Sequence, residues 1–159
     1  MEKLLLKDSF SWRFFMFGFI IALISGALMS IQGVFNTEVT KQSSTWTTST
    51  FVQATGFLAC LIVWFITERD QNFTMLLKVT PKYLLLGGVI GAAITFTVIK
   101  SVASLGPAQS AMLIVAAQSV VSYLIEVFGM FGVEKTGFAW IKLLGVVLFV
   151  AGLIIFKWK

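Results

Sequence analysis

A polar stripe runs along one long apolar segment of the chain. Gln118, Ser122 and Glu126 recur every four residues. Ser119 lies seven residues before Glu126, and spacings of four and seven place side chains on one face of an α-helix. Counted along the apolar run 111–133, Glu126 lies about four residues past the middle, hence about 6 Å from mid-membrane at about 1.5 Å per residue.

Glu126 is the residue of this stripe with chemistry to offer. It is the one acidic residue of the chain with apolar sequence well to both sides. Hydrocarbon disfavours the charged form of a carboxyl group, so a carboxyl there can be neutral or charged and could exchange a proton for a cationic substrate. The alternative is that Glu126 pairs with a lysine or reaches the membrane interface. Lys100 is not the expected partner, because the two residues lie towards opposite faces of the membrane.

A second polar stripe lies on the first apolar segment, where Ser25, Met29, Gln32 and Asn36 share a helical face. Gln32 and Asn36 can each donate and accept hydrogen bonds, so in an internal cavity they would orient a polar ligand. The alternative is hydrogen bonding between helices, at about 0.6–2 kcal/mol per bond. Both alternatives are open for Gln32, whereas the position of Asn36 near the helix end favours a structural role.

Other kinds of site are absent from the sequence. The chain has no histidine and one cysteine, Cys60, so the common nucleophile–base pairs and metal-ligand sets cannot be built. We therefore expect no enzyme activity, no metal and no cofactor. The net charge is +5, but the basic residues lie between apolar runs and form no basic stripe with exposed aromatics. Nucleic acid is therefore not an expected partner.

The composition predicts an integral membrane protein. The chain is 58% apolar and 12% charged, against about 45–50% and roughly 25% in soluble domains. A helix needs about 20 apolar residues to cross the bilayer. Five runs of this kind follow one another within a single transmembrane domain, residues 1–159: 14–35, 51–66, 83–102, 108–133 and 138–156. The expected connections are Thr37–Ser49, Glu68–Lys82, a tight turn at Leu105-Gly106-Pro107 that makes an antiparallel hairpin, and Glu134–Gly137.

Small residues predict where helices pack. Gly87 and Gly91 form a small-xxx-small face that lets a neighbouring backbone approach closely. Gly145 and Gly152 lie seven residues apart in the last run, which indicates a helix–helix seam inside the bundle or between two chains. No polar residue lies deep in this last run, so we do not expect it to line a polar pathway.

The distribution of Lys and Arg predicts the orientation. Five spans put the termini on opposite sides, and more basic residues in short loops mark the cytoplasmic side. One side holds eight basic residues: Lys3, Lys7, Arg13, Arg69, Lys78, Lys82, Lys135 and Lys142. The other holds four: Lys41, Lys100, Lys157 and Lys159. The bias favours a cytoplasmic N-terminus.

Three segments resemble the YdcZ-type inner-membrane exporters, small bacterial members of the drug/metabolite transporter superfamily: Gly26–Asn36, Leu86–Gly91 and Gln118–Gly129. The resemblance covers roughly Gly18 to Phe156. At the position of Glu126 that family more often shows Asp, so the carboxyl is kept.

The last helix, with Leu144-Gly145 and Ala151-Gly152, is also similar to that of the small multidrug resistance proteins, where a similar seam holds the dimer together. Those pumps carry their coupling glutamate in the first helix. This chain has Gln32 and Asn36 there, so their mechanism does not carry over.

The resemblance implies an assembly and a function. Larger superfamily members have ten helices in two inverted halves, so a five-helix chain looks like one half, completed as a homodimer or with an oppositely oriented homologue in the bacterial inner membrane. The implied function is secondary transport, as a proton-coupled exporter of a small organic or cationic metabolite. We expect the site between the first, third and fourth helices, with Glu126 and Gln32 as the best candidates. The alternatives are a passive channel and a non-transporting scaffold or accessory subunit.

Overall fold

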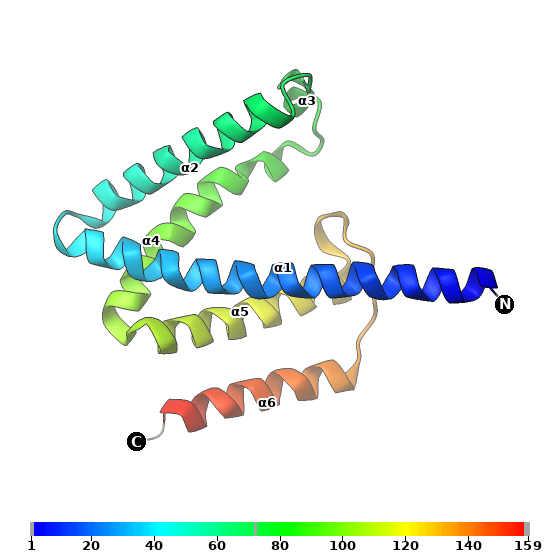
Figure 1. Cartoon of the computed structure of the whole chain (residues 1–159). Helices are drawn as coiled ribbons and strands as arrows, with labels where there is room; N and C mark the ends of the chain where they lie inside the picture. The colour runs from blue at the N-terminus through cyan, green and yellow to red at the C-terminus, as the bar shows by residue number, and fades with distance from the viewer. Residues whose placement is uncertain (1, 72, 158–159) are drawn as a thin grey trace. The chain divides into compact units, whose positions relative to one another are not determined.

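Every regular element is helical in the part of the chain that the computed structural model describes, which is residues 2–71 and 73–157. No strand occurs in that part, as expected of an all-α membrane protein. Side chains are described for residues 12–13, 15–71, 73–152 and 154–156. Lys159 from the orientation count lies outside the described residues, as do the side chains of Lys3, Lys7 and Lys157. The chain forms two compact units, residues 1–81 and 82–159 (Figure 1).

The first unit contains α1 (Glu2–Lys41), α2 (Thr45–Thr67) and the single turn α3 (Thr74–Leu77). The α1 and α2 helices contact each other close to the turn that joins them and splay apart away from it (Figure 1). Ser44 caps α2, because its side chain accepts a hydrogen bond from the backbone N–H of Thr47 at 3.2 Å.

The connection between α1 and α2 is much shorter than the Thr37–Ser49 connection that the sequence predicted. The two helices extend over most of that segment, and only residues 42–44 lie outside them. The hydroxyl side chains are satisfied inside these helices, because they donate to carbonyl groups one turn earlier in their own helix. Thr37 donates to Gly33 and Ser49 donates to Thr45, each at 2.8 Å. Polar residues at these positions therefore continue the helices.

The second unit begins with the 3₁₀ turn η1 (Lys82–Leu86) and continues with α4 (Gly87–Leu105) and α5 (Pro107–Phe128). Gly106 joins the two helices with φ 80° and ψ 163°, and Pro107 starts α5. Proline suits the first helical position, where its missing N–H leaves nothing unpaired. The tight turn predicted at this position is confirmed, and α4 and α5 pack against each other.

The α5 helix ends at Phe128, although the sequence predicted it to run to Val133. Gly129 adopts the left-handed conformation (φ 65°, ψ 40°), which ends a helix and suits glycine. The short 3₁₀ turn η2 (Met130–Gly132) and an irregular segment then lead to α6 (Trp140–Lys157), which also packs against α5. This earlier end corrects the depth of Glu126. It lies about eight residues past the middle of the helix, hence about 13 Å from it at about 1.5 Å per residue.

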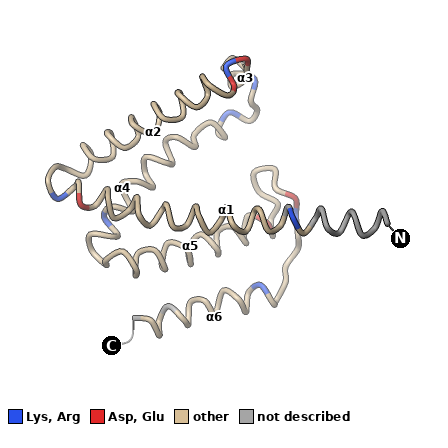
Figure 2. The backbone as a smooth tube through the Cα atoms, in the orientation of Figure 1, with Lys and Arg blue, Asp and Glu red and all other residues tan. Residues whose placement is uncertain are grey.

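Four of the described helical segments are long and apolar enough to cross a membrane: Phe15–Lys41, Thr45–Thr67, Lys82–Leu105 and Pro107–Phe128. The apolar part of α6, Trp140–Phe156, is shorter, so the fifth span and the ten-helix inverted repeat stay predictions. Charged residues of the described chain lie towards helix ends and in connections, except Arg13, which lies inside α1 just ahead of its apolar part (Figure 2). Ile99 is the only buried apolar side chain among those described. The outer surface is thus apolar, as a lipid environment requires.

Candidate functional site

An open groove of about 440 Å³ lies between α5 and α6. Its walls combine apolar side chains with a few polar groups, which is the usual lining of a small-molecule site. The residues that line it are Ser119, Ser122, Tyr123 and Glu126 from α5 and Lys142, Gly145, Val146 and Phe149 from α6. The structure therefore brings three polar residues of the predicted α5 stripe into one site.

An ion pair spans the groove. The Nζ of Lys142 lies 2.8 Å from the Oε2 of Glu126, and both side chains are about half exposed, at 47% and 42%. Glu126 lies in the last turn of α5 and Lys142 in the first turn of α6. Glu126 therefore pairs with a lysine, which is one of the alternatives that the sequence left open. Its partner comes from the last helix, which we had not expected to line a polar pathway.

Tyr123 lines the groove and makes contacts with two residues, Ala139 and Lys142. Its hydroxyl accepts a hydrogen bond from the backbone N–H of Ala139 at 2.7 Å and donates to the carbonyl of Ala139 at 3.1 Å. Its ring centroid lies 5.4 Å from the Nζ of Lys142, within the range of a cation–π interaction. Tyr123 therefore fixes the start of α6 and presents an aromatic face to the ammonium group.

The segment between α5 and α6 folds back onto the end of α5. The backbone N–H of Thr136 donates to the carbonyl of Glu126 at 3.1 Å. Gly129 approaches Lys135 so closely that a Cβ on the glycine would lie 3.1 Å from the Cβ of Lys135. These contacts hold the last turn of α5, and with it the backbone of Glu126, against the connection.

Sequence reasoning missed Tyr123 and Lys142. A signal for Tyr123 was present, because it precedes Glu126 by three residues and so shares its helical face. Lys142 had no comparable local signal. Its approach to Glu126 depends on where α5 ends and on the path of the segment after it.

Gln118, the remaining residue of the α5 stripe, is exposed and is not part of the groove lining. It lies close to the middle of α5, where the membrane is most apolar. Ser25 and Gln32 are exposed on α1. They belong to the other compact unit, so their meeting with Glu126 stays a prediction.

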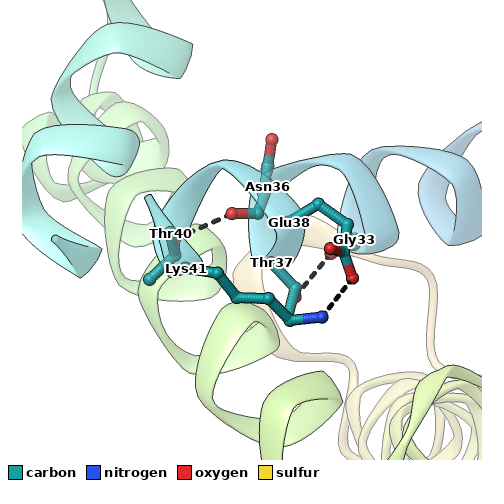
Figure 3. Close-up of polar contacts among 6 residues, drawn as sticks. All are labelled: Gly33, Asn36, Thr37, Glu38, Thr40 and Lys41. Atoms are coloured by element: carbon teal, nitrogen blue, oxygen red, sulfur yellow. Dashed lines mark hydrogen bonds and ion pairs between the residues drawn. The ribbon is translucent and has the colours of Figure 1, made fainter. Parts of the chain in front are cut away.

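Asn36 lies near the end of α1, among the hydrogen bonds that lead into the turn (Figure 3). It is only 7% exposed, and its backbone carbonyl accepts a hydrogen bond from the Thr40 hydroxyl at 2.8 Å. The hydroxyl of Thr48, on α2, lies 3.0 Å from that of Thr40. These bonds involve the backbone of Asn36 and not its side-chain amide, so the structural role of that amide stays a prediction. The nearby pair of Lys41 and Glu38, 2.6 Å apart, is exposed (Figure 3).

The glycines predicted to form packing faces are mostly open within the chain. No atom of a neighbouring described element lies within 4 Å of a Cβ built at Gly87, Gly145 or Gly152. Gly91 is half-buried, and its carbonyl accepts a hydrogen bond from Thr95 at 3.0 Å. A helix–helix seam at the open glycines, including one between two chains, stays a prediction.

Comparison with known proteins identifies one family. The family model described as "putative inner membrane exporter, YdcZ" matches residues 17–155, which is most of the chain and includes the whole groove. Neither the curated proteins nor the solved structures contain a significant match.

Proposed function

Because the chain belongs to the YdcZ family of inner membrane exporters, we propose that it is a proton-coupled secondary exporter of a small organic or cationic metabolite. Glu126 is the proposed site of exchange. The observation that carries this proposal is the Glu126–Lys142 pair, which places the carboxylate in a groove large enough for a small molecule.

The pair suggests how exchange would work. A carboxylate in an apolar setting is costly unless a positive charge or a proton neutralises it. Glu126 can be neutralised by Lys142, by a proton or by a cationic substrate, one at a time. In the proton-bound and the substrate-bound state Lys142 is displaced, and the groove carries the same net charge. One-for-one exchange of a proton for a monovalent cation therefore adds no charge to the site.

A second chain would complete the transporter. The described helices are short of buried apolar residues and expose large apolar side chains along their length. Gln118 adds an exposed amide near the middle of α5, where a polar group needs a partner. A homodimer, or a pair with an oppositely oriented homologue, would supply that partner and form an inverted-repeat assembly. The open glycines Gly145 and Gly152 would be the seam, and because Gly145 also lines the groove, the partner chain would form part of its wall.

One observation favours a different function, that of a non-transporting membrane scaffold. Glu126 lies in the last turn of α5, about 13 Å from its middle, where the half-thickness of the hydrocarbon is about 15 Å. In a scaffold, an ion pair at that depth would join α5 to α6 without exchanging a proton.

The test is proton release by the purified, reconstituted chain when a panel of organic cations is added. We expect release from the wild type, loss of release in Glu126→Gln and retention in Glu134→Gln. Glu134 is the matched control, because it is an exposed acid in the connection after α5 and belongs to no ion pair among the described residues. Release that persists in Glu126→Gln would remove Glu126 as the coupling residue. A flux of the organic cations that does not saturate with their concentration would indicate a channel. The absence of any flux would indicate a scaffold.

A further inference from the structure

The ammonium group of Lys142 has two partners of different kinds. A carboxylate oxygen of Glu126 lies 2.8 Å away, and the ring of Tyr123 lies 5.4 Å away. A carboxylate together with an aromatic face is the combination by which proteins bind ammonium ligands, through a charge-assisted hydrogen bond and a cation–π interaction. These two residues thus form a binding site for an ammonium group, and Lys142 occupies it.

Lys142 is held at this site only by its own flexible side chain. Lys142 lies in the first turn of α6, and four flexible methylene groups connect its backbone to the ammonium group. The side chain is 47% exposed, so the ammonium can leave Glu126 without unpacking a helix.

The groove also offers room beyond the ion pair. Ser119, Ser122 and Phe149 also line the groove, and they lie about one to two helical turns along α5 and α6 from the ion pair. Ser119 donates its hydroxyl to the carbonyl of Val115 at 2.8 Å. The hydroxyl of Ser122 makes no hydrogen bond to any described residue and can donate to a ligand. An organic body attached to an ammonium group would therefore meet one free hydroxyl and an aromatic side chain.

We propose that Lys142 is a tethered competitor in an ammonium-binding site, and that the substrates of this groove carry a primary alkylammonium group that replaces it. This inference rests on the proposed function, since it names the substrate class for the same site. Lys142 pairs with the carboxylate when neither a proton nor a substrate is bound to it. It also lowers the apparent affinity of the site for any substrate, which equals the intrinsic affinity multiplied by the fraction of chains in which Lys142 has left.

Binding of n-butylammonium to the detergent-solubilised full-length chain tests this inference without transport. The probe is the lysine side chain without its backbone. We expect Lys142→Met to bind it on the order of tenfold more tightly than the wild type, since the competitor is gone. Lys142→Arg should show no such gain, because a cation is still tethered there. Ligand-observed NMR gives the dissociation constants, and n-butanol is the neutral control that should gain nothing.

Two double variants locate the bound probe. The gain in Lys142→Met should disappear when Glu126→Gln is added, and it should fall by about twofold to fivefold when Tyr123→Leu is added. Equal dissociation constants for the wild type and Lys142→Met would overturn the inference. A gain that survives Glu126→Gln would do the same. Gel filtration and circular dichroism establish that each variant is folded. Lys142→Arg is a second test of the inference, because it retains the tethered positive charge.

Failure here is distinct from failure of the proposed function. Probe binding that depends on Lys142 and Glu126, together with no proton release from liposomes, would sustain the ammonium site and contradict transport. Proton release with equal probe binding in the wild type and Lys142→Met would sustain transport and contradict the tethered competitor.

Discussion

Lys142 lies 2.8 Å from Glu126 across the groove between α5 and α6, although sixteen residues separate them in the chain. Both residues line the groove, and the ring centroid of Tyr123 lies 5.4 Å from the ammonium group of Lys142. Under the proposed function, a proton and a substrate compete for the Glu126 carboxylate. The predictions below separate that role from a purely structural one.

Glu126→Asp should keep proton release and reduce its rate. The carboxyl group is retained but is one methylene shorter, so it moves away from the ammonium position of Lys142. We expect a loss of roughly tenfold, as small misplacements of a reacting group commonly cause. The rate of proton release from liposomes measures the effect. A rate as low as that of Glu126→Gln would show that position as well as charge is indispensable, whereas an unchanged rate would argue against direct participation.

Tyr123→Phe should destabilise the chain by about 1 kcal/mol while leaving the aromatic face in place. The substitution removes the hydroxyl that bonds to both backbone groups of Ala139. Tyr83→Phe is the control, because the Tyr83 side chain is exposed and its ring contact with Phe131 does not involve the hydroxyl. Unfolding in mixed micelles measures the difference. Equal stability of the two variants would mean that the bonds to Ala139 do not hold the start of α6.

Thr48→Val should weaken the α1–α2 turn by about 1 kcal/mol. Thr48 is 1% exposed, and its hydroxyl lies 3.0 Å from that of Thr40 and 2.9 Å from that of Ser43. Valine has nearly the same shape and cannot make these bonds. Thr55→Val on the same helix is the control, since the Thr55 hydroxyl is exposed and bonds only to carbonyls of its own helix. The prediction fails if both variants unfold at the same denaturant concentration.

Gly129→Ala should destabilise the chain by about 1 kcal/mol or more, because alanine is strained at positive φ. The added methyl group would also lie 3.1 Å from the Cβ of Lys135. Gly56→Ala is the control. It lies inside α2 with open space around it, and alanine there should stabilise the helix by about 0.5–1 kcal/mol. The same unfolding measurement should therefore move in opposite directions for the two variants.

The sequence by itself determined the class of this protein and the polar stripe on one wall of its candidate site. Its apolar composition and long apolar runs require helices in lipid, since only helices and closed barrels satisfy their own backbone there. The spacing of Ser119, Ser122 and Glu126 is local, and a regular helix turns such spacing directly into a shared face.

Only the tertiary structure decided what faces that stripe. The left-handed Gly129 ends α5 early and changes the depth of Glu126, and hydroxyl-to-carbonyl bonds carry α1 through a segment that reads as a loop. Lys142 reaches Glu126 because the segment after α5 folds back and is held by Tyr123 and Thr136. Contacts between residues distant in the chain depend on the whole path between them, and no local spacing encodes that path.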